Sequence, residues 1–238
     1  MNEHSKFKLY YWPIPFRGNF IRCMLSFCNV QYNDATVAEL LELKSADMSS
    51  KDTRAIFMAP PLIYDVEEDI FISQMPAIVL YLARKYNKMP TNNNQITITE
   101  NILLSSNDIL AEISKNNGSM MWQNKEEWQE FIDGRFCRWL SILESQATRN
   151  GLRENAGYFF GNNAATAVDI ILFALIGTMR AKLPEMIPIL LKGCPSVMNL
   201  CDRLLEESSN LKLLFDEQAS NNVYCGGQIE ASIRKVLT

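Results

Sequence analysis

Strand-like segments are confined to the first 86 residues of this 238-residue chain. Residues 7–11 are aromatic and partly alternating, as expected of a strand, and a loop containing Pro13, Pro15 and Gly18 follows them. From Asn19 onward, apolar residues recur at helical spacing. The chain therefore opens with a strand, a proline-containing loop and a helix.

The rest of this first region also combines strands with a helix. The pattern predicts a strand around Val30–Ala35, two short strands at Pro60–Tyr64 and Asp69–Ile72, and a helix over Ala77–Leu82 with Pro76 in its first turn. Residues 36–57 have a mixed pattern that favours no single element. The first region is therefore mixed α/β.

The composition changes after Tyr86. Residues 88–97 include a polar, uncharged stretch and are predicted to form a linker. Beyond them the periodicity is helical, over Ile98–Ile113, Trp128–Leu143 and Thr166–Arg180. The last of these segments is apolar on nearly every side, which is typical of a helix at the centre of a bundle, and Thr166 with Asp169 forms a variant of the capping box at its start. We therefore predict an α/β domain (1–87), a linker (88–97) and an all-helical domain (98–238).

Composition narrows the class of function. With 23 Lys and Arg against 27 Asp and Glu, the net charge of −4 gives no support to nucleic-acid binding. A single histidine disfavours a histidine-rich metal site. The longest apolar run, Ile170–Ile176, is far shorter than a membrane span, and the polar start of the chain lacks a signal peptide. The six cysteines show no C-x-x-C spacing. We expect a cytosolic protein without metal, membrane or nucleic-acid partners.

Four local motifs, in this order, resemble those of the cytosolic glutathione transferase superfamily. The motifs are Tyr11-Trp12-Pro13-Ile14 with Arg17-Gly18, then Ala59-Pro60-Pro61-Leu62, then Ser73-Gln74-Met75-Pro76, and finally Gly161…Thr166…Asp169. The resemblance spans nearly the whole chain. It implies a thioredoxin-like domain that binds glutathione, followed by a helical domain that contributes the pocket for a small hydrophobic electrophile. It also implies glutathione as co-substrate, a homodimer, and a role in detoxification.

The chemistry of this family requires a hydroxyl or thiol near the sulfur of glutathione. A free thiol has a pKa of about 8.5, and a hydroxyl that donates a hydrogen bond to the sulfur favours the thiolate. Between Tyr11 and Gly18 there is no Ser, Thr or Cys, so tyrosine is the candidate. We predict Tyr11 as catalytic residue, with Tyr10 as its rival, and packing in the strand core as the alternative for both. Two residues are inserted between Ile14 and Arg17 relative to the shorter loop of tyrosine-type members.

Several further residues are predicted to bind glutathione by the same resemblance. Pro60 is expected to follow a cis bond, which leaves the backbone of Ala59 to pair with the cysteinyl part of glutathione. Gln74 and Met75 begin a helix whose N–H groups attract the γ-glutamyl carboxylate, although the family usually has Ser where this chain has Met75. Trp12 and Lys51 complete the predicted set, with Arg54 as a second candidate for the glycyl carboxylate.

Two other functions compete with this prediction. The first is a catalytically weak or inactive binding or regulatory protein that keeps the fold, because fold alone does not determine function. The second is a thiol–disulfide oxidoreductase of thioredoxin type, which the absence of cysteine from the loop at Pro13–Pro15 disfavours.

Overall fold

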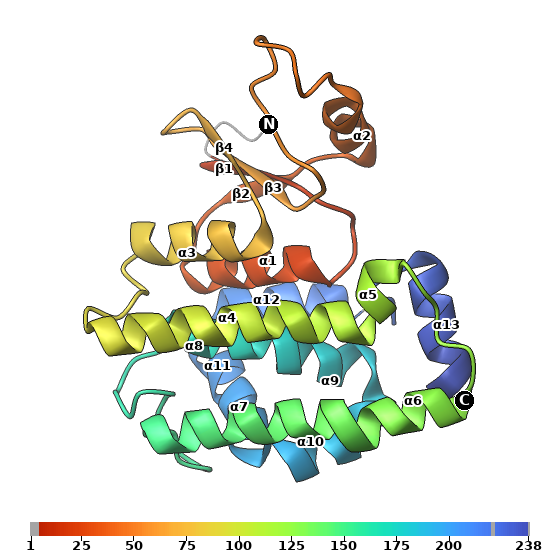
Figure 1. The fold of residues 1–238 in the computed structure, drawn as a ribbon. Helices are drawn as coiled ribbons and strands as arrows, with labels where there is room; N and C mark the ends of the chain where they lie inside the picture. The colour runs from red at the N-terminus through yellow and green to blue at the C-terminus, as the bar shows by residue number, and fades with distance from the viewer. Residues whose placement is uncertain (1–4, 220–221, 238) are drawn as a thin grey trace.

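In the part of the chain that the structure describes, four strands near the N-terminus form one sheet with strand order β2-β1-β3-β4 (Figure 1). The computed structural model describes residues 5–219 and 222–237. The strands are β1 (Phe7–Tyr10), β2 (Tyr32–Asp34), β3 (Leu62–Asp65) and β4 (Ile70–Ser73). β1 is parallel to β2 and antiparallel to β3, and β3 and β4 are antiparallel. The parallel pair is connected through helix α1 (Arg17–Phe27), as a parallel pair requires.

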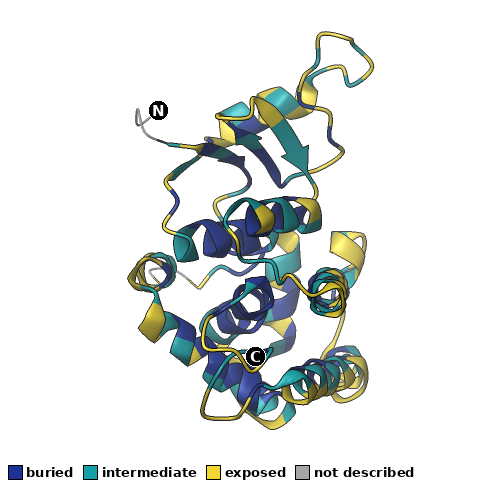
Figure 2. Ribbon diagram, turned by 90° about the vertical axis from the view of Figure 1, so that its left-hand side faces the viewer, coloured by how far each residue is buried: buried dark blue, intermediate teal, exposed yellow. Residues whose placement is uncertain are grey.

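The two faces of the sheet are covered differently. Phe7 and Leu9 of β1 belong to the main hydrophobic core, together with residues of α1 and α3 (Met75–Lys85). Tyr10 belongs instead to a smaller apolar cluster with Leu40 of α2 (Val37–Ser45) and Leu62. Successive side chains of a strand point to opposite faces, so this alternation decides which aromatic residue lies on which side. Figure 2 shows buried residues gathered on the sheet and on the inner helices.

The connection between the two halves is shorter than predicted. Helix α4 (Asn93–Ile113) begins inside the segment 88–97 that the sequence predicts as a linker. The Asn92 side chain accepts hydrogen bonds from the N–H groups of Asn94 and Gln95, at 2.9 and 3.3 Å, and so caps this helix. The polar asparagine run is therefore a helix start as well as a connection.

The C-terminal part is helical, as predicted. Among the described residues after β4, only the isolated bridge between Arg153 and Ala156 has strand pairing. The helices after α4 are α5 (Lys115–Gly118), α6 (Lys125–Phe131), α7 (Cys137–Asn150), α8 (Ala167–Leu172), α9 (Thr178–Lys182), α10 (Ile187–Gly193), α11 (Pro195–Glu207), α12 (Ser209–Gln218) and α13 (Gly227–Leu237). The π-helical turns η1 (Ile132–Phe136) and η2 (Phe173–Gly177) join α6 to α7 and α8 to α9, and η3 (Pro184–Met186) is a 3₁₀ turn. No described helix is long and apolar enough to cross a membrane.

The predicted capping motif anchors the central helix α8. The N–H and hydroxyl groups of Thr166 donate to one carboxylate oxygen of Asp169, at 2.8 and 2.9 Å, and the N–H of Phe159 donates to the other at 2.8 Å. Asp169 is fully buried, and this burial raises its pKa to about 6 against the effect of its donors. The motif therefore ties the loop before α8 to the start of the central helix.

Candidate active site

A cavity of about 260 Å³ lies where the two halves of the chain meet. The loop between β1 and α1 contributes much of its wall, through Tyr11, Trp12, Ile14, Phe16 and Arg17. Other wall residues come from α2, from the segment before β3, from the α4–α5 region, and from the C-terminal segment. Figure 1 shows α5 and α13 side by side at this edge of the molecule. Segments far apart in the sequence therefore build one site.

Tyr11 lies at the N-terminus of α1. It is only 5% exposed, and its hydroxyl oxygen accepts a hydrogen bond from the N–H of Arg17 at 3.2 Å. Its ring leaves no room for a side chain at position 18, because a Cβ on Gly18 would lie 2.2 Å from Cδ1 of Tyr11. Burial raises the pKa of Tyr11 to about 12, so the hydroxyl keeps its proton at neutral pH. A protonated phenol at a helix N-terminus can donate a hydrogen bond to an anionic sulfur.

Tyr10, the rival candidate, faces the opposite side of the sheet. Its ring packs against Phe71, with 6.2 Å between ring centroids, in the cluster beneath α2. β1 ends at Tyr10, so Tyr11 is the first residue of the loop. The geometry therefore favours Tyr11 as the tyrosine of this cavity.

The two inserted loop residues, Pro15 and Phe16, do not move Tyr11 away from the helix start. Phe16 is 6% exposed, and its ring packs edge-on against Tyr224, with 5.4 Å between centroids. The longer loop is therefore accommodated by the C-terminal segment, and the bond from Arg17 to the Tyr11 hydroxyl is still made.

The buried side chain of Arg22 holds the loop in place. Its guanidinium donates to the carbonyl oxygens of Ile14 and Trp12, at 3.1 and 3.2 Å, and forms an ion pair with Asp34 at 2.7 Å. Arg22 is 5% exposed. The sequence analysis missed this role, for which the only signal was a charged residue within a helix of predominantly apolar periodicity.

The cis peptide bond before β3 lies at a different position from the predicted one. The cis peptide bond joins Pro60 to Pro61, one residue later than predicted. The residue before the cis bond is thus Pro60, which has no N–H, and not Ala59. Ala59 and Pro60 both line the cavity.

Gln74 and Met75 begin helix α3, as predicted, but neither lines the cavity. Gln74 is exposed at the N-cap position with a φ of 71°, whereas the Met75 side chain is 1% exposed and packs in the main core. Its backbone N–H lies in the first helical turn, where N–H groups lack intrahelical partners. The substitution of Met for the family's usual Ser thus leaves the N–H in place and removes a hydroxyl donor.

The lysine that lines the cavity is Lys44 rather than Lys51. Lys44 lies in the last turn of α2, lines the cavity, and places its ammonium group 5.6 Å from the ring centroid of Trp12. Lys51 is exposed and is not among the lining residues, and Arg54 forms an exposed ion pair with Asp69 at 2.6 Å. No local pattern distinguished Lys44 from other surface lysines.

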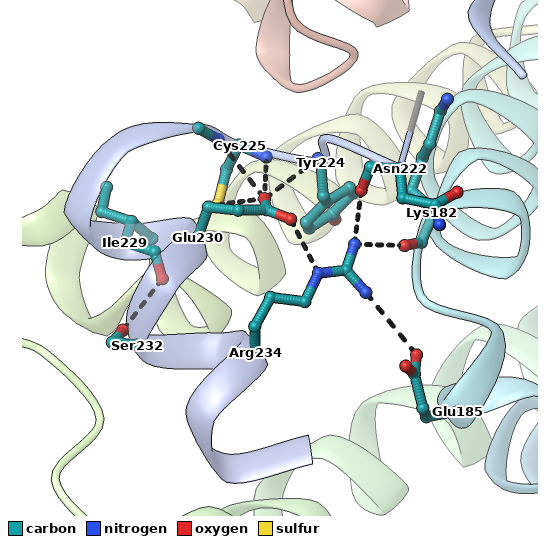
Figure 3. Close-up of polar contacts among 10 residues, drawn as sticks. Lys182, Glu185, Asn222, Tyr224, Cys225, Ile229, Glu230, Ser232 and Arg234 are labelled. Carbon is teal, nitrogen blue, oxygen red and sulfur yellow. Dashed lines mark hydrogen bonds and ion pairs between the residues drawn. The ribbon is translucent and has the colours of Figure 1, made fainter. Parts of the chain in front are cut away.

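The C-terminal segment closes one side of the cavity. Figure 3 shows Glu230 of α13 turned back toward the segment that precedes the helix. Its carboxylate accepts the N–H groups of Tyr224, Cys225 and Gly226, at 2.9, 2.8 and 3.3 Å. Burial would raise the pKa of Glu230, but these donors together with Arg234 lower it. Cys225 and Ile229 are thereby placed in the cavity wall.

Arg234 fastens the same helix to the body of the protein. Its guanidinium donates to Glu230 at 2.9 Å and to the carbonyl oxygen of Lys182 at 2.7 Å (Figure 3). In the described ranges 5–219 and 222–237, no group of three or more His, Cys, Asp or Glu residues is arranged to hold a metal ion. The side chains that line the cavity offer the phenol of Tyr11, the cations of Arg17 and Lys44, the polar groups of Ser114, Asn117 and Cys225, and apolar walls.

The architecture of cytosolic glutathione transferases is a thioredoxin-like sheet followed by a helical bundle, and here the hydroxyl of a tyrosine after the first strand lies at the start of the first helix. Residues 98–236 match the family "Glutathione S-transferase, C-terminal domain". The chain therefore belongs to the glutathione S-transferase family, and the predicted family and fold class are confirmed.

Relatives and solved structures agree with this assignment. The chain is 25% identical over 183 residues to a glutathione S-transferase of Plasmodium falciparum, covering 74% of this chain and 82% of the relative. A Pi-class glutathione S-transferase of Onchocerca volvulus superposes with a TM-score of 0.72 at 20% identity, covering 94% of this chain and 98% of that one. A sigma-class enzyme of Fasciola hepatica superposes with a TM-score of 0.69 at 18% identity, covering 92% and 100%. At these identities the solved structures support the fold.

Proposed function

We propose that this protein is a tyrosine-type glutathione transferase that activates the thiol of glutathione for addition to small hydrophobic electrophiles. The observation that carries the proposal is the Tyr11 hydroxyl, which is protonated, lies at the N-terminus of α1, and borders the cavity. Trp12, Ala59 and Pro60 border the same cavity. In this proposal Lys44 replaces Lys51 as the partner of the glycyl carboxylate, and the first turn of α3 binds the γ-glutamyl carboxylate.

Tyr11 acts in this proposal by stabilising the thiolate. A hydrogen bond to a charged group contributes roughly 1.5–3 kcal/mol, and 1.36 kcal/mol corresponds to one pKa unit. The Tyr11 hydroxyl therefore lowers the pKa of the bound thiol by about one to two units. At pH 6.5, where a thiol of unperturbed pKa is almost entirely protonated, its removal reduces the thiolate fraction roughly tenfold to a hundredfold.

The test measures binding to immobilised glutathione and conjugation of 1-chloro-2,4-dinitrobenzene by wild type, Tyr11→Phe and Tyr10→Phe. We expect Tyr11→Phe to bind glutathione but to lose activity roughly tenfold to a hundredfold at pH 6.5. Tyr10→Phe is the matched control and should keep its activity. A wild-type protein that neither binds glutathione nor conjugates the halide would refute the proposed enzyme. An active Tyr11→Phe would refute the catalytic assignment.

The alternative is a catalytically weak or inactive protein that retains the fold as a binding or regulatory module. One observation favours it: Met75 lacks the hydroxyl of the usual Ser. Glutathione binding without turnover of any aryl halide would support this alternative.

The family also suggests assembly and location, which we include in the proposal. We propose a cytoplasmic homodimer with a role in detoxification, in which residues 1–87 bind glutathione and residues 98–238 contribute the electrophile pocket. Size-exclusion chromatography with light scattering tests the dimer directly, because a dimer has twice the 27.2 kDa of the chain.

A further inference from the structure

The 260 Å³ cavity that Tyr11, Arg17 and Lys44 line is cationic. Its wall contains Arg17 and Lys44, and none of its described lining residues is Asp or Glu. Removal of a charged side chain from water is costly unless it is paired, so buried charges are usually found with a partner of opposite charge. An uncompensated positive charge in a substrate cavity is therefore a binding feature to be explained.

Arg17 is held by neutral groups only. Its Nε donates to Oδ1 of Asn107 at 3.1 Å, and its Nη2 donates to Oδ1 of Asn117 at 2.6 Å. The guanidinium carbon lies 5.1 Å from the centroid of the Phe16 ring. Within residues 5–219 and 222–237 Arg17 forms no ion pair with a carboxylate, so the amides orient its charge without neutralising it.

The donors of Arg17 exceed these two bonds. A guanidinium has five N–H donors in a rigid fork, and it matches a carboxylate in bidentate geometry. Burial lowers the pKa of Arg17, as expected of a desolvated cation without an anionic partner, yet an arginine remains charged at neutral pH. The side chain is thus fixed, charged and still able to donate.

The two cations of the cavity differ in their neighbours. Lys44 stacks on Trp12, on the sheet side, where our proposed function places glutathione. Arg17 is anchored by Asn107 of α4 and by Asn117 of α5, both in the helical half of the chain. Arg17 is therefore held by the half of the chain that contributes the electrophile pocket in the proposed function.

We propose that Arg17 selects electrophiles that carry a carboxylate, so that the second substrate is an organic acid rather than a purely apolar molecule. This inference rests on the proposed function. In the reaction the thiolate attacks the electrophilic carbon, a C–S bond forms, and for an aryl halide the C–Cl bond breaks with release of chloride. The thiol proton leaves to solvent, and the carboxylate stays bound to Arg17 and takes no part in bond making.

The test compares 4-chloro-3,5-dinitrobenzoate with its methyl ester, because the two share the reacting carbon and differ in charge. We expect Arg17→Gln to lower kcat/KM for the acid on the order of tenfold to a hundredfold, because a charge-assisted hydrogen bond is lost. The kcat/KM for the ester should change less than about threefold. Arg17→Lys should retain part of the preference, because it keeps the charge and loses the fork.

Arg138→Gln is the matched control. Arg138 is exposed on α7, so this variant makes the same charge change away from the cavity. Equal losses with acid and ester in Arg17→Gln would overturn the proposal, since they would place the action of Arg17 on the thiolate or the fold. No loss with either substrate would overturn it as well. The backbone N–H that bonds the Tyr11 hydroxyl is retained in both Arg17 variants.

A binding measurement separates this inference from the proposed function. Calorimetry compares the glutathione conjugate of the acid with that of its methyl ester, in wild type and in Arg17→Gln. If wild type catalyses nothing but binds the acid conjugate more tightly, and Arg17→Gln abolishes that difference, the proposed enzyme fails and the role of Arg17 stands. If wild type turns over the ester but shows no preference that depends on Arg17, the enzyme stands and the role of Arg17 fails.

Discussion

Replacement of Gly18 by Ala tests whether the ring of Tyr11 must lie where the structure places it. Gly18 is in the first turn of α1, and a Cβ there would lie 2.2, 2.6 and 2.9 Å from Cδ1, Cγ and Cε1 of Tyr11. Carbon atoms in contact are normally about 3.5–4.0 Å apart, so the overlap exceeds about 1 Å. The ring must move, and its hydroxyl must leave the N–H of Arg17.

The magnitude follows from this overlap. Overpacking of this kind costs roughly 1–3 kcal/mol, and the exchange of Gly for Ala in a helix returns about 0.5–1 kcal/mol. We therefore expect the free energy of unfolding to fall by no more than about 2.5 kcal/mol, which leaves the protein folded. A hydroxyl displaced by about 1 Å no longer bonds the sulfur, so kcat/KM at pH 6.5 should fall roughly tenfold to a hundredfold.

The assay is conjugation of 1-chloro-2,4-dinitrobenzene, together with an ultraviolet titration of the bound thiolate and thermal unfolding. Gly134→Ala is the matched control, because a Cβ on Gly134 would have no neighbouring atom within 4 Å. This variant should keep full activity, and its Tm should equal or exceed that of the wild-type protein. A Gly18→Ala variant whose thiol pKa and kcat/KM equal those of wild type would show that the position of Tyr11 does not control the thiol.

Two further predictions concern the scaffold. Asp169→Ala removes the acceptor of three hydrogen bonds at the start of α8, and we expect the free energy of unfolding in urea to fall by about 3 kcal/mol, whereas Thr166→Ser should stay near wild type. Burial would raise the pKa of Asp65, but its ion pair with Lys85 at 2.7 Å and its other hydrogen-bond donors lower it. The ionised carboxylate therefore stabilises the fold above a pH of about 4, and this contribution is lost as the pH falls through the lowered pKa. Between pH 5 and pH 3, roughly the range set by the carboxyl pKa values, the free energy of unfolding of Lys85→Met should therefore fall less than that of wild type, or rise. Urea titrations that show the same dependence of this free energy on pH in both proteins would contradict the role of the Asp65–Lys85 ion pair.

Much of the fold follows from local pattern. The strands lie within two or three residues of their predicted bounds, because period-two alternation and the prolines are local signals. The capping box of α8 could be predicted because its two residues, Thr166 and Asp169, are only three positions apart. The π-helical turns η1 and η2 were not predicted, since a single widened turn does not change the apolar periodicity of a helix.

The candidate site was only partly predictable. Because the first loop contains no Ser, Thr or Cys, the sequence left tyrosine as the candidate for its hydroxyl. The sequence did not identify Lys44 as a lining residue of the cavity. It also placed the cis bond one residue early, because neighbouring prolines are equivalent in sequence and differ only in the backbone around them.

The sequence alone determined that an α/β region precedes a helical one and that any hydroxyl of the first loop belongs to a tyrosine. The tertiary structure decided which tyrosine borders the cavity, because β1 ends at Tyr10 and Tyr11 packs with the core on the α1 side of the sheet. It also decided that the cavity has a wall from the chain's end: Phe16 packs against Tyr224, more than 200 residues later, and Glu230 secures that segment. Contacts between residues so far apart in the sequence leave no periodic pattern in it. Each of the two residues fits only its own local pattern, and whether they meet depends on how the whole chain packs.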